Sequence, residues 1–241
     1  MLIKTRGIVL KTKKYSETSI IADIYTEEKG LRSYIISGVR SKRSRVSAGL
    51  LQIMTPVEIV AYHREGKSLT RLKEIKPYYV FQSIPFEVAR SAVGMFMVEI
   101  AQKAIHAEES QPLLFEFLLE NFVHLDETPH SFANLHLHYM ANLTEHLGFL
   151  PSDVYTEETP VFDLKEGGFM PFNPAHPHWL RPELGAKLSQ LLQLPKEQSH
   201  TVLFSREERK SLLRSLIDYY RLHIEHFPVI HSFEILEEVL G

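Results

Sequence analysis

The stretch 19–37, SIIADIYTEEKGLRSYIIS, decides the fold of the first third of this chain. Apolar and polar residues alternate on both sides of the central EEKG, which is the pattern of half-buried β-strands. Gly30 ends the EEKG turn and accepts the left-handed backbone conformation that a tight turn requires without steric cost. The stretch therefore predicts two antiparallel strands joined by a hairpin.

Similar short apolar segments surround this hairpin. Five strands are expected within about 75 residues, a number and spacing typical of a small closed barrel such as the OB-fold. In the first strand, Gly7 predicts a bend or bulge, with Ile3 and Val9 near one face. The five predicted strands are residues 3–13, 19–26, 31–37, 55–63 and 69–75.

After Pro77 the apolar period changes from two to about 3.6, so the rest of the chain is predicted to be helical. Ser131 is a candidate cap for one helix, and Ser205 with Glu208 has the spacing of a capping box in another. The expected helices cover residues 86–105, 112–125, 131–151, 182–194, 205–227 and 232–240.

The fold class is therefore α+β. We expect a basic OB-fold domain at residues 1–80 and an acidic helical domain at 81–241, which contains a cysteine-free irregular loop at 152–182. The apolar stretches are too short to span a membrane, and the N-terminal segment is charged, so a cytoplasmic protein is expected.

The two predicted domains carry opposite charge. Residues 1–80 contain 16 Lys and Arg against 7 Asp and Glu, a net of +9, while residues 81–241 carry a net of −12. Such a division indicates an anionic partner for the first domain, and phosphate is the usual candidate.

Cations and aromatic rings are interleaved along the predicted barrel, as a surface for single-stranded nucleic acid requires. The segment 37–49, SGVRSKRSRVSAG, holds four cations and no carboxylate. Such a run is either a solvated loop or a site for a polyanion. The candidate nucleic-acid-binding residues are Arg6, Lys11, Lys13, Lys14, Tyr15, Arg32, Tyr34, Arg40, Lys42, Arg43, Arg45, Lys67, Arg71 and Lys73.

Tyr34 has an alternative role in the barrel core. Arg32 is placed on the same side of the strand, and an arginine is difficult to bury without a partner, which favours exposure of that side. No base-reading helix is recognisable, so binding is expected to depend on the DNA backbone and on salt.

Metal sites have little support in the sequence. The chain has no cysteine, and His136 and His138 would diverge on a helix. His176 and His178 lie in the irregular loop without an obvious third ligand, while His223 and His226 resemble surface groups. We expect no metal and no cofactor.

Catalysis also lacks a positive signal. The sequence has no nucleophile elbow, no phosphate-binding glycine motif and no cysteine nucleophile. A metal-assisted nuclease would need clustered carboxylates near the basic face, and only Asp23, Glu27 and Glu28 are candidates. No catalytic residue is predicted.

The order of features resembles the RecO family of recombination and DNA repair proteins. The residues that carry the resemblance are TRGIVLKTKKYSETSII, then TEEKGLRSYIISGVR with the basic loop, then LLQIMTPVEIV and RLKEI, followed by the long helical region. Order and spacing together make the resemblance strong, and it covers the whole chain.

This resemblance implies an OB-fold that binds single- and double-stranded DNA and anneals complementary strands. It implies work with RecR to load recombinase onto DNA coated by single-strand-binding protein, and a helical domain that docks the acidic, Phe-ended tail of that protein. Association with the nucleoid would follow. The alternative is an interaction scaffold whose basic barrel docks an acidic protein.

One departure concerns metal. Many relatives carry a four-cysteine zinc module between helices, and the corresponding segment here, residues 154–180, keeps the Gly-Gly turn without any cysteine. We expect this segment to be held by its prolines and by packing of Phe162, Phe169, Phe172 and Trp179.

Overall fold

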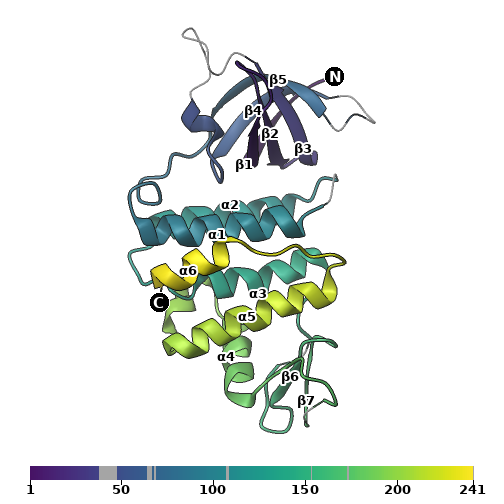
Figure 1. Cartoon of the computed structure of the whole chain (residues 1–241), viewed down its shortest axis with the longest axis vertical. Coiled ribbons are helices and arrows are strands. Elements are labelled where there is room, and N and C mark those ends of the chain that lie inside the picture. Colours follow the sequence, from purple (N-terminus) through teal and green to yellow (C-terminus); the bar gives the residue numbers. More distant parts are fainter. Residues whose placement is uncertain are drawn as a thin grey trace. The chain divides into compact units, whose positions relative to one another are not determined.

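The computed structural model describes residues 1–37, 48–63, 67, 69–106, 109–152, 154–172 and 174–240 (Figure 1). The chain divides into two compact units. The first consists of Met1–Phe86 with Ile105–Val123, and the second of Glu87–Ala104 with His124–Gly241. The boundary near residue 80 that the sequence indicates stays a prediction.

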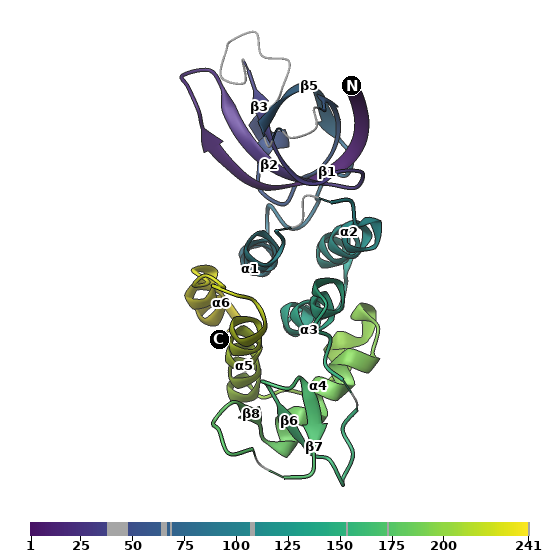
Figure 2. The same ribbon diagram turned by 90° about the vertical axis from the view of Figure 1, so that its right-hand side faces the viewer.

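The first unit contains the expected five-stranded barrel. The strands are β1 (Leu2–Lys14), β2 (Ile20–Thr26), β3 (Gly30–Ile36), β4 (Pro56–Tyr62) and β5 (Leu69–Pro77), with a short 3-10 helix, η1, at Ala48–Leu51. They close in the order β1-β2-β3-β5-β4, and the end-on view in Figure 2 shows the ring. β3 and β5 pair in parallel, while the other pairs are antiparallel.

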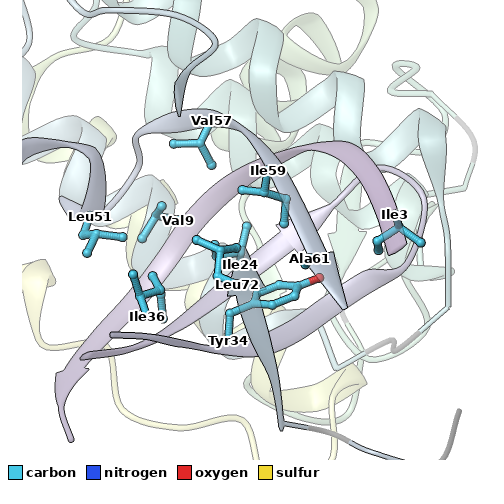
Figure 3. Packing of buried hydrophobic residues seen from close by; sticks show 11 residues of the cluster. Ile3, Val9, Ile24, Tyr34, Ile36, Leu51, Val57, Ile59, Ala61 and Leu72 are labelled. Carbon is cyan, nitrogen blue, oxygen red and sulfur yellow. The ribbon is translucent and has the colours of Figure 1, made fainter. Parts of the chain in front are cut away.

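Side chains that point inward from all five strands fill the barrel (Figure 3). Because successive residues of a strand face opposite sides, each strand contributes alternate residues to this core. Tyr34 is one of them, with 2% of its surface exposed. The others are Ile3, Val9, Ala22, Ile24, Ile36, Val57, Ile59, Ala61 and Leu72, with Leu51 from η1.

The bulge in β1 lies elsewhere than expected. Gly7 pairs regularly with Thr26 and Val57, whereas the register with β2 shifts between Val9 and Lys11. A glycine is needed at position 7 for a different reason. A Cβ there would lie 2.5 Å from the Cγ2 atom of Ile24. The prediction of a bulge at Gly7 is therefore wrong, although a bulge exists two residues further on.

In the part of the chain that the structure describes, six α-helices follow the barrel, together with a 3-10 helix, η2, at Lys196–Thr201. They are α1 (Val88–Ala104), α2 (Pro112–Glu127), α3 (Leu135–Leu147), α4 (Pro182–Gln193), α5 (Arg206–His223) and α6 (Ser232–Leu240). The capping box of Ser205 and Glu208 at α5 is confirmed. The cap predicted at Ser131 is wrong, since α3 begins after Asn134.

The stretch predicted as an irregular loop contains three short strands, β6 (Val161–Asp163), β7 (Gly168–Met170) and β8 (Trp179–Leu180), in the order β7-β6-β8. Phe162 and Phe169 are buried as expected. Phe172 does not contribute, because 69% of its surface is exposed.

Three of the histidines considered as metal ligands are used for packing. His136 and His138 are buried in α3. His223 is not the surface group that the sequence suggested, since its Nε2 atom lies 2.9 Å from the carbonyl oxygen of Leu164. His226 is exposed. Within the described residues, no group of three or more His, Asp or Glu side chains is arranged to hold a metal ion.

Candidate nucleic-acid interface

One outer side of the barrel carries several cations that form no ion pair within the described residues. The cross-strand register places Lys13 of β1 beside Ile21, Ile21 beside Ile35, and Ile35 beside Arg71 of β5. Ile21 lies next to Ala22, whose side chain faces the core, so this row faces outward. A cation therefore stands at each end of an apolar pair, across a width of about 14 Å at usual strand spacing.

A second row lies directly beside the first. It runs from Lys11 through Asp23 and Ser33 to Leu69, and the Ser33 hydroxyl donates to the Asp23 carboxylate. We call the outward side chains of these two rows, from β1 to β5, the open face.

The bulge after Val9 creates this face. Val9 points into the core, and without the extra residue Lys11 and Lys13 would point inward as well. Because the bulge shifts the alternation by one residue, both lysines emerge on the outside. The local sequence does not reveal this shift, since it depends on pairing with β2.

The cations of the open face are exposed to solvent and can bind a phosphate group. Lys11, Lys13, Lys14 and Arg71 are exposed, and in the described ranges none of them forms an ion pair with a carboxylate. Lys67 is exposed as well. Tyr15, which follows β1 directly, has 59% of its surface exposed and offers a ring for stacking.

The beginning of β1, where the Lys4 side chain also faces outward, is electrostatically compensated. Lys4 and Lys76 both reach the Glu58 carboxylate, at 3.4 and 2.7 Å. The hydrogen bond from Lys76 is the main reason why the pKa of Glu58 is lowered. We call Lys4, Glu58 and Lys76 the paired face. It is less suited to phosphate than the open face, because both of its cations are paired with the Glu58 carboxylate.

Arg6, a predicted DNA contact, is engaged within the first unit. It forms two hydrogen bonds to Glu27 and one to Glu116. Its guanidinium also lies over the rings of Tyr78 and Phe115, 5.3 and 5.1 Å from their centroids. This arrangement stabilises the contact between β1 and α2, so we do not include Arg6 in the proposed interface.

Tyr34 and Arg32 do not mark an exposed side. Tyr34 pairs with Ala22 across β2 and β3 and points into the barrel, where burial raises its pKa to about 12. Arg32 is half-buried on the same side of β3, and its Nε donates to the carbonyl oxygen of Lys29 at 3.1 Å. The expected exposure of this side is therefore wrong, because Arg32 finds a partner in the adjacent turn.

The remaining predicted cations have different positions. Lys73 is exposed and lies 3.7 Å from the Glu74 carboxylate. Arg40, Lys42, Arg43 and Arg45 lie outside the described residues, in the segment that connects Ser37 to Ala48.

Comparison with protein-family models gives two matches. Residues 1–81 match the model for the N-terminal part of recombination protein O, and residues 85–231 match the model for its C-terminal part. The chain belongs to the RecO family. The DNA repair protein RecO of Phocaeicola vulgatus is 36% identical over 241 residues and covers the whole of both chains.

Two further relatives match the chain over nearly its whole length. The RecO of Bacteroides fragilis strain YCH46 is 35% identical over 240 residues, 99% of each chain, and that of Flavobacterium psychrophilum is 35% identical over 242 residues, the full length of both. The family is one of DNA repair proteins with an N-terminal barrel, so the resemblance noted in the sequence is confirmed.

This RecO-family chain also has a pocket in its helical unit. Three of the cations that the sequence offers as candidates for a peptide pocket, Arg206, Arg209 and Lys210, line it, whereas the candidates Arg90, Lys103 and Arg214 do not. A cavity of about 110 Å³ is lined by apolar residues of α5 and α6 and by cations from the first turns of α5. Its lining consists of three leucines, three cations, two carboxylates and a histidine: Leu213, Leu236, Leu240, Arg206, Arg209, Lys210, Glu207, Glu237 and His136. We call this cavity the α5 pocket. Lys210 pairs with Glu237 at 3.0 Å, which leaves Arg206 and Arg209 as the cations for a ligand.

Two polar groups in the α5 pocket lack full compensation. Arg209 is half-buried and donates from Nε to the Asn134 side-chain oxygen at 3.2 Å, and within the described residues no carboxylate pairs with it. His136 is 1% exposed and its Nδ1 atom has no hydrogen-bond partner. Burial, together with the nearby charge of Arg209, lowers the pKa of His136 to about 3, so the ring is neutral.

The candidate nuclease residues do not form a metal site. Asp23 accepts a hydrogen bond from Ser33, and Glu27 is paired with Arg6. A magnesium site would need such carboxylates to converge on one point with free oxygens.

No described helix is long and apolar enough to cross a bilayer.

Proposed function

We propose that this RecO-family chain binds single- and double-stranded DNA through the open face of its barrel. The observation that carries the proposal is the contrast between the two ends of one strand. Within the described residues, Lys11 and Lys13 project from the end of β1 without an ion pair, whereas Lys4 at its beginning shares Glu58 with Lys76. Phosphates bind where cations are exposed and uncompensated.

The same chemistry supports strand annealing. The exposed cations of the open face, Lys11, Lys13 and Arg71, contact a sugar-phosphate backbone without reading base edges. Neutralised backbones repel one another less, while the unread base edges stay free to pair. We propose that the protein anneals complementary strands and acts as a recombination mediator without catalysing a reaction itself.

RecR and single-strand-binding protein are the proposed protein partners. With them the chain would help load recombinase onto coated DNA, at the nucleoid. The α5 pocket is our candidate site for the acidic, Phe-ended tail. Its three leucines accept an aromatic ring, and Arg209 supplies a charge that lacks a carboxylate.

Fluorescence anisotropy tests the DNA proposal. A labelled poly-dT strand and a labelled duplex are titrated with the full chain at several salt concentrations, and an acidic peptide of equal charge serves as the comparison. We expect DNA binding that weakens steeply with salt. Binding of the peptide that matches or exceeds binding of DNA would instead support the scaffold alternative.

Annealing and catalysis are tested with the same strands. Addition of the protein to two complementary labelled strands is expected to speed their pairing. The strands should remain intact after long incubation with magnesium, and their cleavage would contradict a non-catalytic role.

The pocket is tested with a synthetic acidic peptide that ends in Phe. We expect binding to the full chain, and loss of roughly tenfold or more in affinity for Arg209→Ala or for the peptide with an amidated terminus. Arg221→Ala is the control, because Arg221 is exposed on the same helix and pairs with Asp218. Equal affinity of all proteins for the peptide would place the site elsewhere.

A further inference from the structure

The hairpin of β6 and β7 is pressed closely onto α5. Gly167 forms its turn with a φ of +70°, and a Cβ at this position would lie 2.7 Å from the hydroxyl oxygen of Tyr219. That hydroxyl donates a hydrogen bond of 2.7 Å to the carbonyl oxygen of Phe149. One tyrosine therefore contacts both the turn and the segment that leads from α3 into the small sheet.

Aromatic rings form a cluster around Tyr219. His223, one turn further along α5, lies with its ring centroid 4.3 Å from that of Tyr219 and is stacked on Phe149 at 5.3 Å with an interplanar angle of 6°. Phe162 of β6 lies 5.8 Å from Tyr219 and 5.0 Å from Phe169 of β7. We call Phe149, Phe162, Phe169, Tyr219 and His223 the aromatic cluster.

Hydrogen bonds fix the same segment. The Nε2 atom of His223 lies 2.9 Å from the Leu164 carbonyl oxygen, and the buried Asp163 carboxylate accepts from the backbone N–H of Lys165 at 2.7 Å. The other oxygen of Asp163 lies 3.3 Å from Nε2 of His176. Asp163, His176 and His223 thus each have a partner within the chain through a ring nitrogen or carboxylate oxygen, while the Nδ1 atom of His176 is buried without one.

These residues do not fit the zinc ion that the family resemblance implies for this segment. The chain has no cysteine, so the four thiolates of such a module have no equivalent. The Nε2 atoms of His223 and His176 are already engaged, with Leu164 and Asp163. The buried Nδ1 atom of His176 has no hydrogen-bond partner, but it is a single nitrogen, and a zinc ion needs three or four ligands. In the described ranges no three potential ligands converge.

We propose that the aromatic cluster takes the structural place of the metal, holding residues 149–180 on α5 by ring packing and the hydrogen bonds of Tyr219 and His223. Offset and edge-to-face ring pairs add to the free energy of burial. The hydroxyl of Tyr219 lies so close to the turn that only glycine fits at position 167. The fold of this segment then depends neither on zinc supply nor on thiol oxidation.

Thermal unfolding and metal analysis test the proposal on the full chain. We expect no stoichiometric zinc in the purified protein, and a melting temperature unchanged by a strong chelator or by added zinc. One bound zinc per chain, with a melting temperature that falls on chelation, would overturn the proposal.

Two variants test whether the aromatic cluster holds the segment on α5. His223→Ala and Phe162→Leu should each lower the melting temperature by roughly 5 °C or more and speed hydrogen exchange in β6 and β7. His226→Asn is the control, because His226 is exposed with a φ of 55° that asparagine tolerates. If both cluster variants melt and exchange as the control does, the cluster does not hold the segment.

Discussion

Arg6 and Glu27 form a two-pronged ion pair that joins β1 to the turn after β2. The Nε atom of Arg6 donates to one carboxylate oxygen at 2.8 Å, and a terminal nitrogen donates to the other at 2.7 Å. This pair, reinforced by Glu116 of α2, explains why a cation on a basic strand does not belong to the open face. β1 therefore contributes structure at its beginning and exposed charge at its end.

Replacement of Arg6 separates these two roles. Arg6→Gln leaves the carboxylates of Glu27 and Glu116 without their cation, so we expect a loss of about 1–3 kcal/mol in the free energy of unfolding. Urea unfolding measures this loss. The salt dependence of DNA binding by the folded variant should match that of the unmodified chain, and a clearly flatter dependence would return Arg6 to the interface.

Gly7 is predicted to be intolerant of a methyl group. A Cβ in Gly7→Ala would approach Ile24 Cγ2 to 2.5 Å inside a closed barrel, where the strands have little freedom to separate. We expect a loss of about 1–3 kcal/mol in unfolding free energy, as for other overpacked cores. An unchanged urea midpoint would show that β2 moves aside at no cost.

Glu99 should make part of the stability dependent on pH. Burial alone would raise its pKa, but hydrogen bonds from Lys103, from Ser232 and from the backbone N–H of His231 outweigh this effect and hold the pKa at about 2. The folded-state pKa lies below the ordinary value of 4.5, so the contribution is present above about pH 4.5 and is lost as pH falls toward 2.

The comparison of Glu99→Gln with the unmodified chain tests this dependence. At pH 7 the free energy of unfolding of the variant should be lower by up to about 3 kcal/mol. The reason is that an uncharged glutamine loses the ion pair with Lys103 and accepts more weakly from the backbone N–H groups of His231 and Ser232 at the start of α6. The difference should shrink as pH falls from 4.5 toward 2 in parallel urea titrations. A difference that stays constant over this range would assign the effect to packing and not to charge.

Two tyrosines of the barrel should respond differently to substitution. Tyr15 is exposed beside the open face, and Tyr15→Ala should weaken binding of single-stranded DNA by about 1 kcal/mol, roughly fivefold. Tyr34→Phe removes only a buried hydroxyl and should leave DNA affinity unchanged. Anisotropy titrations with poly-dT measure both, and a loss confined to Tyr34→Phe would contradict the inward orientation of that ring.

Local patterns predicted the local structure well. The hairpin around Gly30 and the capping box of Ser205 depend on residues a few positions apart, and both are present. The bulge after Val9 depends on register with another strand, and the ion pair of Arg6 with Glu116 joins residues 110 positions apart. Neither could be inferred from neighbouring residues.

The candidate site could also be predicted only in part from the sequence. Composition identified the barrel as basic, and the exposed positions of Lys11, Lys13 and Arg71 agree with that expectation. Which cations are neutralised depends on folded distances, as the shared use of Glu58 illustrates. The cations of the α5 pocket are among the candidates that the sequence offers, but the pocket could not be located, because its leucines come from α5 and α6, which only the fold brings together.

The salt dependence of poly-dT binding by two charge-matched variants tests the central claim most directly. Lys13→Ala with Arg71→Ala removes two cations from the open face, and Lys4→Ala with Lys76→Ala removes two from the paired face. The first should bind more weakly and lower the slope of log K against log salt by about 1.4, as expected for two lost phosphate contacts. The second should retain nearly the full slope. Equal losses in the two variants, or a loss confined to the second, would contradict the assignment of DNA binding to the open face.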